Sequence, residues 1–300
     1  MTGPTVVLGL PIDCTGIFAG CERAPAALRA AGLVTHLGLP DLGDLPIRID
    51  DPTRDPATGM IGYRQVVAVS HVIRDAVHDL LAGGQRPLLI GGCCTLMIGT
   101  AAALNGLYGD DVGLVFVDGH ADCYDGISSP TGEAADMDLA IVTGSGPAEL
   151  TALSGHAPMI RPRHTALIGT RDLDAARRDG SPNPPPGAIV IPAEAINGLA
   201  EASTAGRTAL GALLDRVARF WLHLDLDVLS SEALPAVDYP IPGGLDWDEL
   251  AAIVGPMIAS PSCVGIDVTI YNPTLDHDGR SAQRIVGFLE SVTGRHSESS

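Results

Sequence analysis

Residues 112–122 read Val-Gly-Leu-Val-Phe-Val-Asp-Gly-His-Ala-Asp, an apolar run followed directly by acidic and imidazole side chains. The apolar run 112–117 predicts a buried β-strand. Asp118, His120 and Asp122 follow it, spaced so that an extended chain would point all three side chains to one face. Closely packed carboxylates repel one another and are costly to bury, but a divalent cation removes both objections. The stretch therefore predicts a strand that ends in a metal site.

A second acidic motif follows another apolar run. Residues 220–227 read Phe-Trp-Leu-His-Leu-Asp-Leu-Asp, so that Asp225 and Asp227 again stand two apart at a strand end. Four carboxylates and one imidazole form an oxygen-rich set that suits Mn²⁺ or Mg²⁺. Such a set could hold two ions roughly 3.5–4 Å apart, which would lower the pKa of a bridging water and supply hydroxide at neutral pH. One motif alone could be a solvated loop, but a second motif at another strand end favours metal.

The rest of the chain alternates between short apolar runs and helical patterns. We expect further strands at 6–10, 87–90, 165–168, 188–191 and 263–268. We expect helices at 24–30, 63–82, 95–107, 137–142, 205–219 and 281–289, another that starts with a capping box at Asp246, and an irregular surface loop at 38–60. Continuous apolar strands alternating with helices are typical of a mainly parallel sheet covered on both faces. Ligands bind at the carboxyl ends of such strands, so the two acidic motifs can share one site.

Composition sets limits on partners and location. The 300 residues are 46% hydrophobic and 18% charged, which is ordinary for a globular protein. A formal net charge of −18 argues against nucleic acid and anionic membranes as partners. The sequence has no apolar run of membrane-spanning length, no convincing signal peptide and no CxxC pair among its six cysteines. We expect a cytoplasmic protein with reduced thiols and a small-molecule substrate, one domain over 1–294 and a disordered tail at 295–300.

Several ordered motifs resemble those of the ureohydrolase family (arginase, agmatinase, formiminoglutamase), and the resemblance covers nearly the whole chain. Residues 118–122 are similar to the family's Asp-Ala-His-x-Asp, 223–227 to its Ser-x-Asp-x-Asp, and 91–94 to its Gly-Gly-Asp-His. The resemblance implies a three-layer α/β/α sandwich, the arginase/deacetylase-like fold, with two Mn²⁺ ions. It also implies hydrolysis of linear non-peptide C–N bonds and a homo-oligomer, a trimer or hexamer.

The resemblance also implies a metal ligand set with one departure. Its members would be Cys94, Asp118, His120, Asp122, Asp225 and Asp227. Asp118 and Asp225 would bridge the two ions, and a cysteine stands at position 94, where the family has histidine. A thiolate is softer, so the first site would be weak, empty or tuned to Zn²⁺ or Fe²⁺. A similar cysteine occurs in the branch that hydrolyses N-hydroxyarginine, which favours a liganding role. The alternative is that Cys94 is a small buried hydrophobe.

The substrate-reading positions depart further from the family. Ile270 stands where arginases and agmatinases have the Glu that pairs with the guanidinium, so Asp125 or Asp136 would have to replace it. Residues 123–150 contain no histidine to shuttle protons. The remaining candidates are Asp122, Asp136 and His277 for catalysis, and Asp174 and Tyr124 for substrate binding. The alternatives are a solvated loop for His277 and a helix first turn for Asp174.

The first hypothesis is an arginase-like amidinohydrolase that uses metal-bridging hydroxide, with modified guanidines such as hydroxyarginine among its candidate substrates. A formimino or amide hydrolase of the same fold is the alternative within the enzymes. A non-catalytic relative with one metal or none is the alternative outside them.

Overall fold

The computed structural model describes residues 4–182 and 184–294, so the tail expected at 295–300 lies outside the described residues. Its strands form one parallel sheet in the order β2-β1-β3-β8-β7-β4-β5-β6. The strands are β1 (Thr5–Leu10), β2 (Asp41–Asp44), β3 (Arg86–Gly91), β4 (Val112–Val117), β5 (Thr165–Ile168), β6 (Ile189–Ile191), β7 (Arg219–Asp225) and β8 (Cys263–Thr269). The expected parallel sheet is confirmed.

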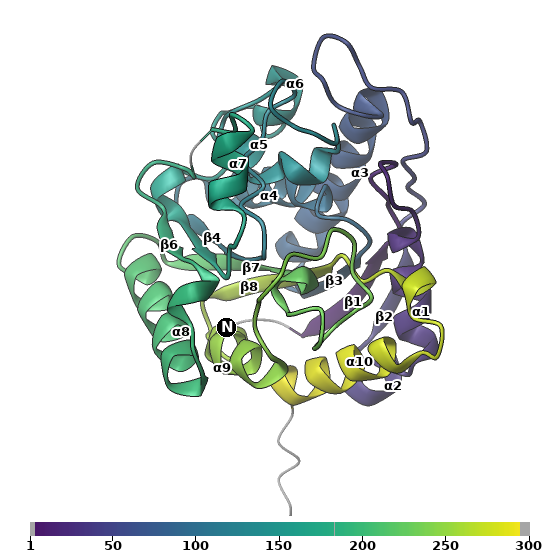
Figure 1. Ribbon diagram of the computed structural model, residues 1–300, viewed down its shortest axis with the longest axis vertical. Coiled ribbons are helices and arrows are strands. Elements are labelled where there is room, and N and C mark those ends of the chain that lie inside the picture. The colour runs from purple at the N-terminus through teal and green to yellow at the C-terminus, as the bar shows by residue number, and fades with distance from the viewer. Residues whose placement is uncertain (1–3, 183, 295–300) are drawn as a thin grey trace, which may run out of the picture.

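Helices cover both faces of this sheet. They are α1 (Ala24–Ala30), α2 (Leu33–Leu37), α3 (Tyr63–Ala82), α4 (Leu96–Tyr108), α5 (Asp138–Val142), α6 (Ala148–Thr151), α7 (Leu173–Arg178), α8 (Leu199–Leu214), α9 (Trp247–Ile258) and α10 (Arg280–Thr293). Figure 1 shows α3, α4 and α5 on one side of the sheet and α8, α9 and α10 on the other. The three-layer α/β/α sandwich is therefore confirmed.

Close packing against the sheet explains why the central elements are so apolar. Helix α4 is buried from Leu96 to Asn105 because α3 covers its outer side. A Cβ at Gly99 would lie 2.6 Å from the carbonyl oxygen of Ser70, so glycine lets α4 and α3 approach closely. Strand β4 is buried along its whole length. This rigid centre fixes the positions of the side chains that follow the strands.

The carboxyl ends of the central strands all open at one edge of the sheet. Strands β3 and β4 lie on opposite sides of the central β8-β7 pair, so the strand order reverses its direction at the middle of the sheet. A crevice forms at such a reversal of strand order. The residues after β3, β4, β7 and β8 therefore meet in that crevice.

Two expectations about local structure were wrong. The segment 38–60 is not wholly irregular, because Asp41–Asp44 forms the edge strand β2, held by backbone pairing with β1 rather than by apolar burial. The helix expected at 205–219 is α8, which runs from Leu199 to Leu214. It begins after Gly198, whose φ of 106° ends the preceding loop, and Arg219 already belongs to β7. The capping box at Asp246 is confirmed, with Glu249 as its partner.

Candidate functional site

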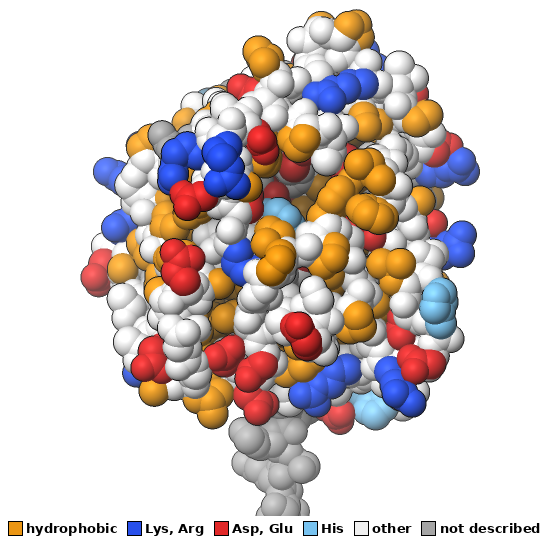
Figure 2. Space-filling view, in the orientation of Figure 1, with side chains coloured by type: hydrophobic (Ala, Val, Ile, Leu, Met, Phe, Trp, Pro, Cys, Tyr) orange, Lys and Arg blue, Asp and Glu red, His pale blue; other side chains and the backbone are white. Residues whose placement is uncertain are grey.

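A cavity of about 310 Å³ opens at the carboxyl edge of the sheet. In Figure 2 it is the hollow of the visible face, with acidic side chains and a histidine inside and hydrophobic side chains around it. Its floor carries the residues after β4 and β7, and its wall includes the loop after β3 and residues 130–136. Its volume suits a small molecule.

One group of possible metal ligands consists of Asp118, His120 and Asp227. The Nδ1 atom of His120 lies 2.8 Å from Oδ2 of Asp227 and 3.8 Å from Oδ1 of Asp118. The backbone amide of Gly119 donates to Oδ1 of Asp227 at 3.0 Å. Strands β4 and β7 are neighbours in the sheet, so their carboxyl ends bring these side chains together.

A second group adjoins the first and contains the cysteine. Cys94 Sγ donates to Oδ2 of Asp225 at 2.6 Å, and Thr269 Oγ1 lies 3.1 Å from the same sulfur. The backbone amide of Asp227 donates to Oδ1 of Asp225 at 2.7 Å, which fixes that carboxylate between the two groups. Asp118, His223, Asp225 and Cys94 bring their ligand atoms within 4.8 Å of one another.

Without a cation, burial and mutual repulsion disfavour the ionised forms of the carboxylates at this edge of the sheet. Burial, and then the charge of Asp227, raises the pKa of Asp118 to about 6. Burial, and then neighbouring carboxylates, raises the pKa of Asp122 and Asp225 well above its usual range. Asp122 also has a left-handed backbone, with φ 44°, which is costly for a residue other than glycine and is common at functional sites. A divalent ion would relieve this repulsion, so the donor set fits the metals that the sequence predicted.

Two buried side chains at the site were missed by sequence reasoning. His223 and Asp138 are fully buried and belong to groups that could hold a metal ion. His223 stood inside the second motif, in the place of the family's serine, and that replacement was the signal. Asp138 gave no signal, because only the folding of residues 130–138 back over the strand ends brings it near Cys94 and Asp122.

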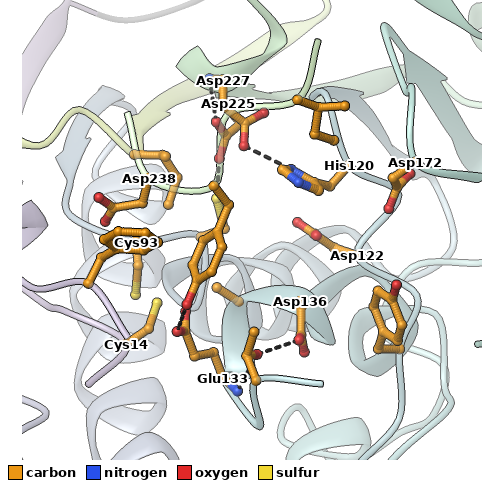
Figure 3. A pocket seen from close by; sticks show the side chains of 18 of the residues that line it. Cys14, Cys93, His120, Asp122, Glu133, Asp136, Asp172, Asp225, Asp227 and Asp238 are labelled. Carbon is orange, nitrogen blue, oxygen red and sulfur yellow. Dashed lines mark hydrogen bonds and ion pairs between the residues drawn. The ribbon is translucent and has the colours of Figure 1, made fainter. Parts of the chain in front are cut away.

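Two acidic side chains on the opposite side of the cavity belong to neither group of possible metal ligands. In Figure 3, Glu133 and Asp136 face the two groups of possible metal ligands across the cavity. Glu133 is 6% exposed and accepts hydrogen bonds from the Tyr239 hydroxyl and the Ile17 amide. Burial raises its pKa to about 7. Glu133 is a third residue that the sequence interpretation did not single out.

Asp136 is the only one of the expected proton carriers outside the ligand set that lines the cavity in the described structure. Its Oδ2 accepts from Ser129 at 2.7 Å and Thr131 at 2.6 Å, and burial raises its pKa to about 6. His277 is exposed beyond β8 and does not line the cavity.

Of the two expected substrate-binding residues, one lines the cavity and the other points away from it. Tyr124 lines the cavity, and its hydroxyl donates to Asp179 at 3.1 Å. Asp174 points outward, with its side chain 82% exposed and paired with Arg177, whereas its neighbour Asp172 lines the cavity. The carboxylate of Asp125 accepts from Ile127 and Ser128 in its own turn. Ile270, with φ 66°, lines the cavity.

The fold and the site together define an α/β/α protein with a metal-type centre at the carboxyl edge of its sheet. A family model described as "Arginase family" matches residues 4–294. The arginase of Bacillus caldovelox is 28% identical over 297 residues, which cover 97% of this chain and 98% of the relative. The arginase of Bacillus subtilis is 28% identical over 294 residues, covering 96% and 97%.

Structural similarity agrees with these sequence matches. The structure of the Bacillus caldovelox arginase superposes with a TM-score of 0.83 at 26% identity, covering 97% of this chain and 98% of that one. The chain belongs to the arginase family, whose members hydrolyse C–N bonds. Within the described ranges, no helix is both long and apolar enough to cross a membrane.

Proposed function

We propose that the protein is a metal-dependent hydrolase of a linear, non-peptide C–N bond in a small substrate of the amidine or guanidine class. The observation that carries this proposal is the convergence of Asp118, His120, Asp122, Asp225 and Asp227 at one edge of the sheet. These positions match the family's ligand motifs, and Mn²⁺ is the ion we propose for the oxygen-rich group around His120. When bound, the metal would lower the pKa of a water molecule and so supply a nucleophile.

The protein's own residues would position the substrate and move protons. We propose that Asp136 carries the proton to the leaving nitrogen, because its carboxyl group faces the cavity and its pKa of about 6 lies near neutral pH. The Ser129 and Thr131 hydroxyls hold this carboxyl group in place. Tyr124 and Asp172 line the same cavity and would contact the rest of the substrate.

We propose Glu133 as the partner of a cationic amidine or guanidinium. Ile270 cannot compensate a cation, and Asp125 is engaged in its own turn. Glu133 offers a buried carboxylate on the cavity wall, held by Tyr239. A charge-assisted hydrogen bond at such a site contributes about 1.5–3 kcal/mol to binding.

A neutral formimino or amide substrate is the second candidate. The apolar side chain of Ile270 on the cavity wall favours it, because a neutral group needs no compensating charge. The two candidates differ in their need for Glu133.

A substrate panel tests the proposal. The full-length chain, purified with Mn²⁺, would be assayed for hydrolysis of arginine, hydroxyarginine, agmatine and formimino compounds, before and after metal removal and reloading. Metal-dependent turnover of an amidine or guanidine compound is the expected result. Tight binding of a small molecule without metal and without turnover would instead identify a non-catalytic relative.

We also propose that the protein assembles into a trimer or hexamer, as the family resemblance implies. Light scattering coupled to size-exclusion chromatography measures this directly, and a monomer of about 31 kDa would refute it.

A further inference from the structure

One member of the second group of possible metal ligands is a fully buried imidazole. His223, on β7, is 0% exposed, and its Nδ1 lies 2.5 Å from Oδ2 of Asp267 on β8. Oδ1 of the same carboxylate accepts from Nε1 of Trp221. Trp221 thus fixes one oxygen of Asp267, and the other oxygen of Asp267 fixes the imidazole of His223. A carboxylate at Nδ1 orients a histidine so that Nε2 is presented as a metal ligand.

The sequence makes room for this arrangement. A Cβ at Gly265 would lie 2.1 Å from the ring of Trp221, so glycine on β8 is what allows the indole to lie across to Asp267. The ring of His223 also packs on Phe116, with centroids 4.4 Å apart. The imidazole is therefore fixed in place on both sides, as a preorganised ligand requires.

The outward nitrogen of this imidazole lacks a hydrogen-bond partner within the described part of the chain. His223 Nε2 and Asp118 Oδ2 are both buried and both unpartnered, and they lie 3.8 Å apart. That separation is too long for a hydrogen bond, so a proton on Nε2 would satisfy neither atom. Two ligands about 2.0–2.3 Å from one ion at a tetrahedral angle lie roughly 3.3–3.8 Å apart. A cation between the two atoms would satisfy both.

Cys94 and Asp225 complete a set of four ligand atoms around this position. The set offers one imidazole nitrogen, one sulfur and two carboxylate oxygens, and all four residues are buried. Thiolate and imidazole ligands favour Zn²⁺ over Mn²⁺, and structural and catalytic zinc sites use such mixed sets. The group around His120 contains no sulfur and keeps the harder character that suits Mn²⁺.

We propose that His223 supplies the imidazole ligand that position 94 does not provide, and that Cys94, Asp118, His223 and Asp225 together bind one Zn²⁺. Asp118 would bridge the two ions, because its Oδ1 faces His120 and its Oδ2 faces His223. The centre would then be mixed, with zinc at the cysteine side and manganese at the His120 side. This inference rests on the proposed function only in that both place divalent ions in the same cavity.

Metal content of the full-length protein tests the proposal. Protein stripped of metal would be loaded with excess Mn²⁺ and then given one equivalent of Zn²⁺ per chain, because Zn²⁺ binds most nitrogen and oxygen sites more tightly than Mn²⁺, and both metals would be measured by mass spectrometry. One zinc and one manganese per chain are expected. His223→Ser should lose most of the zinc and lower zinc affinity by more than about 100-fold. The control His164→Ser removes another buried histidine, at the amino end of β5, and should keep the zinc.

X-ray absorption at the zinc edge of the wild-type protein tests the same ligands without relying on a variant that folds. One sulfur and one imidazole nitrogen beside oxygen ligands are expected. A zinc ion without sulfur, or a zinc content in His223→Ser equal to that of the wild type, would overturn the proposal.

Hydrolysis assayed on the same samples separates this inference from the proposed function. Turnover with manganese alone and no bound zinc would overturn the zinc assignment and leave the hydrolase. A zinc ion bound by sulfur and imidazole with no turnover of any amidine would support the zinc assignment and overturn the proposed hydrolase.

Discussion

Glu133 is the residue on which the choice between a cationic and a neutral substrate depends. Its carboxyl group is buried at the cavity wall, and no Arg or Lys of the described chain forms a salt bridge with it. A substrate cation would be a natural counter-charge. Burial also raises the pKa of Glu133 to about 7, so its carboxyl group changes its protonation in the neutral range.

We predict that Glu133→Gln raises the KM for a cationic amidine or guanidine about 10- to 100-fold, because a charge-assisted hydrogen bond becomes a neutral one. Steady-state kinetics on the best substrate of the panel measure this. The exposed Glu201→Gln is the matched control and should leave KM unchanged. An unchanged KM for the cationic substrate in Glu133→Gln would exclude Glu133 as the partner of its charge.

The same residue predicts a pH dependence. Burial raises the pKa of Glu133 to about 7, so the carboxyl group is protonated and neutral at lower pH. The KM for a cationic substrate should therefore fall as pH rises through about 7, where the carboxylate forms. Glu133→Gln has no such group to titrate, and its KM should lose this step. A step that persists in the variant would assign the titration to another residue.

Asp136 is predicted to act on turnover rather than on binding. Asp136→Asn should lower kcat by about 100- to 10,000-fold with little change in KM, because an amide cannot carry the proton. Ser129 and Thr131 can still donate to the Asn oxygen, so the loop should keep its shape. Asp174→Asn, on the exposed face of α7, is the control. Equal kinetics for Asp136→Asn and the wild type would exclude the proposed role.

Among the elements, helix α9 packs on β8, α8 and α10. Its N-terminus is held by the capping box, in which the Asp246 side chain accepts from the Glu249 amide at 2.8 Å and Glu249 accepts from the Asp246 amide at 2.9 Å. Glu249 also accepts from the amide of Gly198, at the start of α8. One pair of residues thus joins α8, which packs on β5 and β6, to α9, which packs on β8.

We predict that Asp246→Ala lowers the free energy of unfolding by about 1 kcal/mol, the usual effect of losing an N-cap. Chemical denaturation of the metal-loaded protein measures this change. Asp248→Ala, also acidic and exposed in the same first turn, lacks the cap hydrogen bond and should change stability less. Equal losses in both variants would show that helix charge, not the cap, carries the effect.

Elements were predictable wherever their signal was local. The apolar runs of β4 and β7 and the helical period of α3 are visible in the sequence, because burial on one or both faces dictates them. β2 was not predictable, because its exposed residues are held by backbone pairing to β1. The site followed the same rule. The acidic motifs predicted most of the possible metal ligands, whereas the path of residues 130–138 alone brings Asp138 to Cys94 and Asp122 and Glu133 to the cavity wall.

At the scale of the whole molecule, the sheet brings together acids that repel one another. Asp118, Asp122 and Asp225 come from the carboxyl ends of neighbouring strands and are buried together. Their raised pKa values show that the folded chain holds them at a cost when they are ionised. Metal binding is therefore expected to be linked to the stability of the entire fold.

We propose that this cluster binds divalent metal for hydrolysis, and Asp118 belongs both to the group around His120 and to the group around Cys94. The most direct measurement compares metal content and turnover in the wild type and in Asp118→Asn. We predict that the variant loses bound metal and that its turnover falls by at least about 1,000-fold, because several kcal/mol of metal-derived stabilisation is lost. An Asp118→Asn protein that folds, binds no metal and still hydrolyses the substrate at the wild-type rate would contradict the claim.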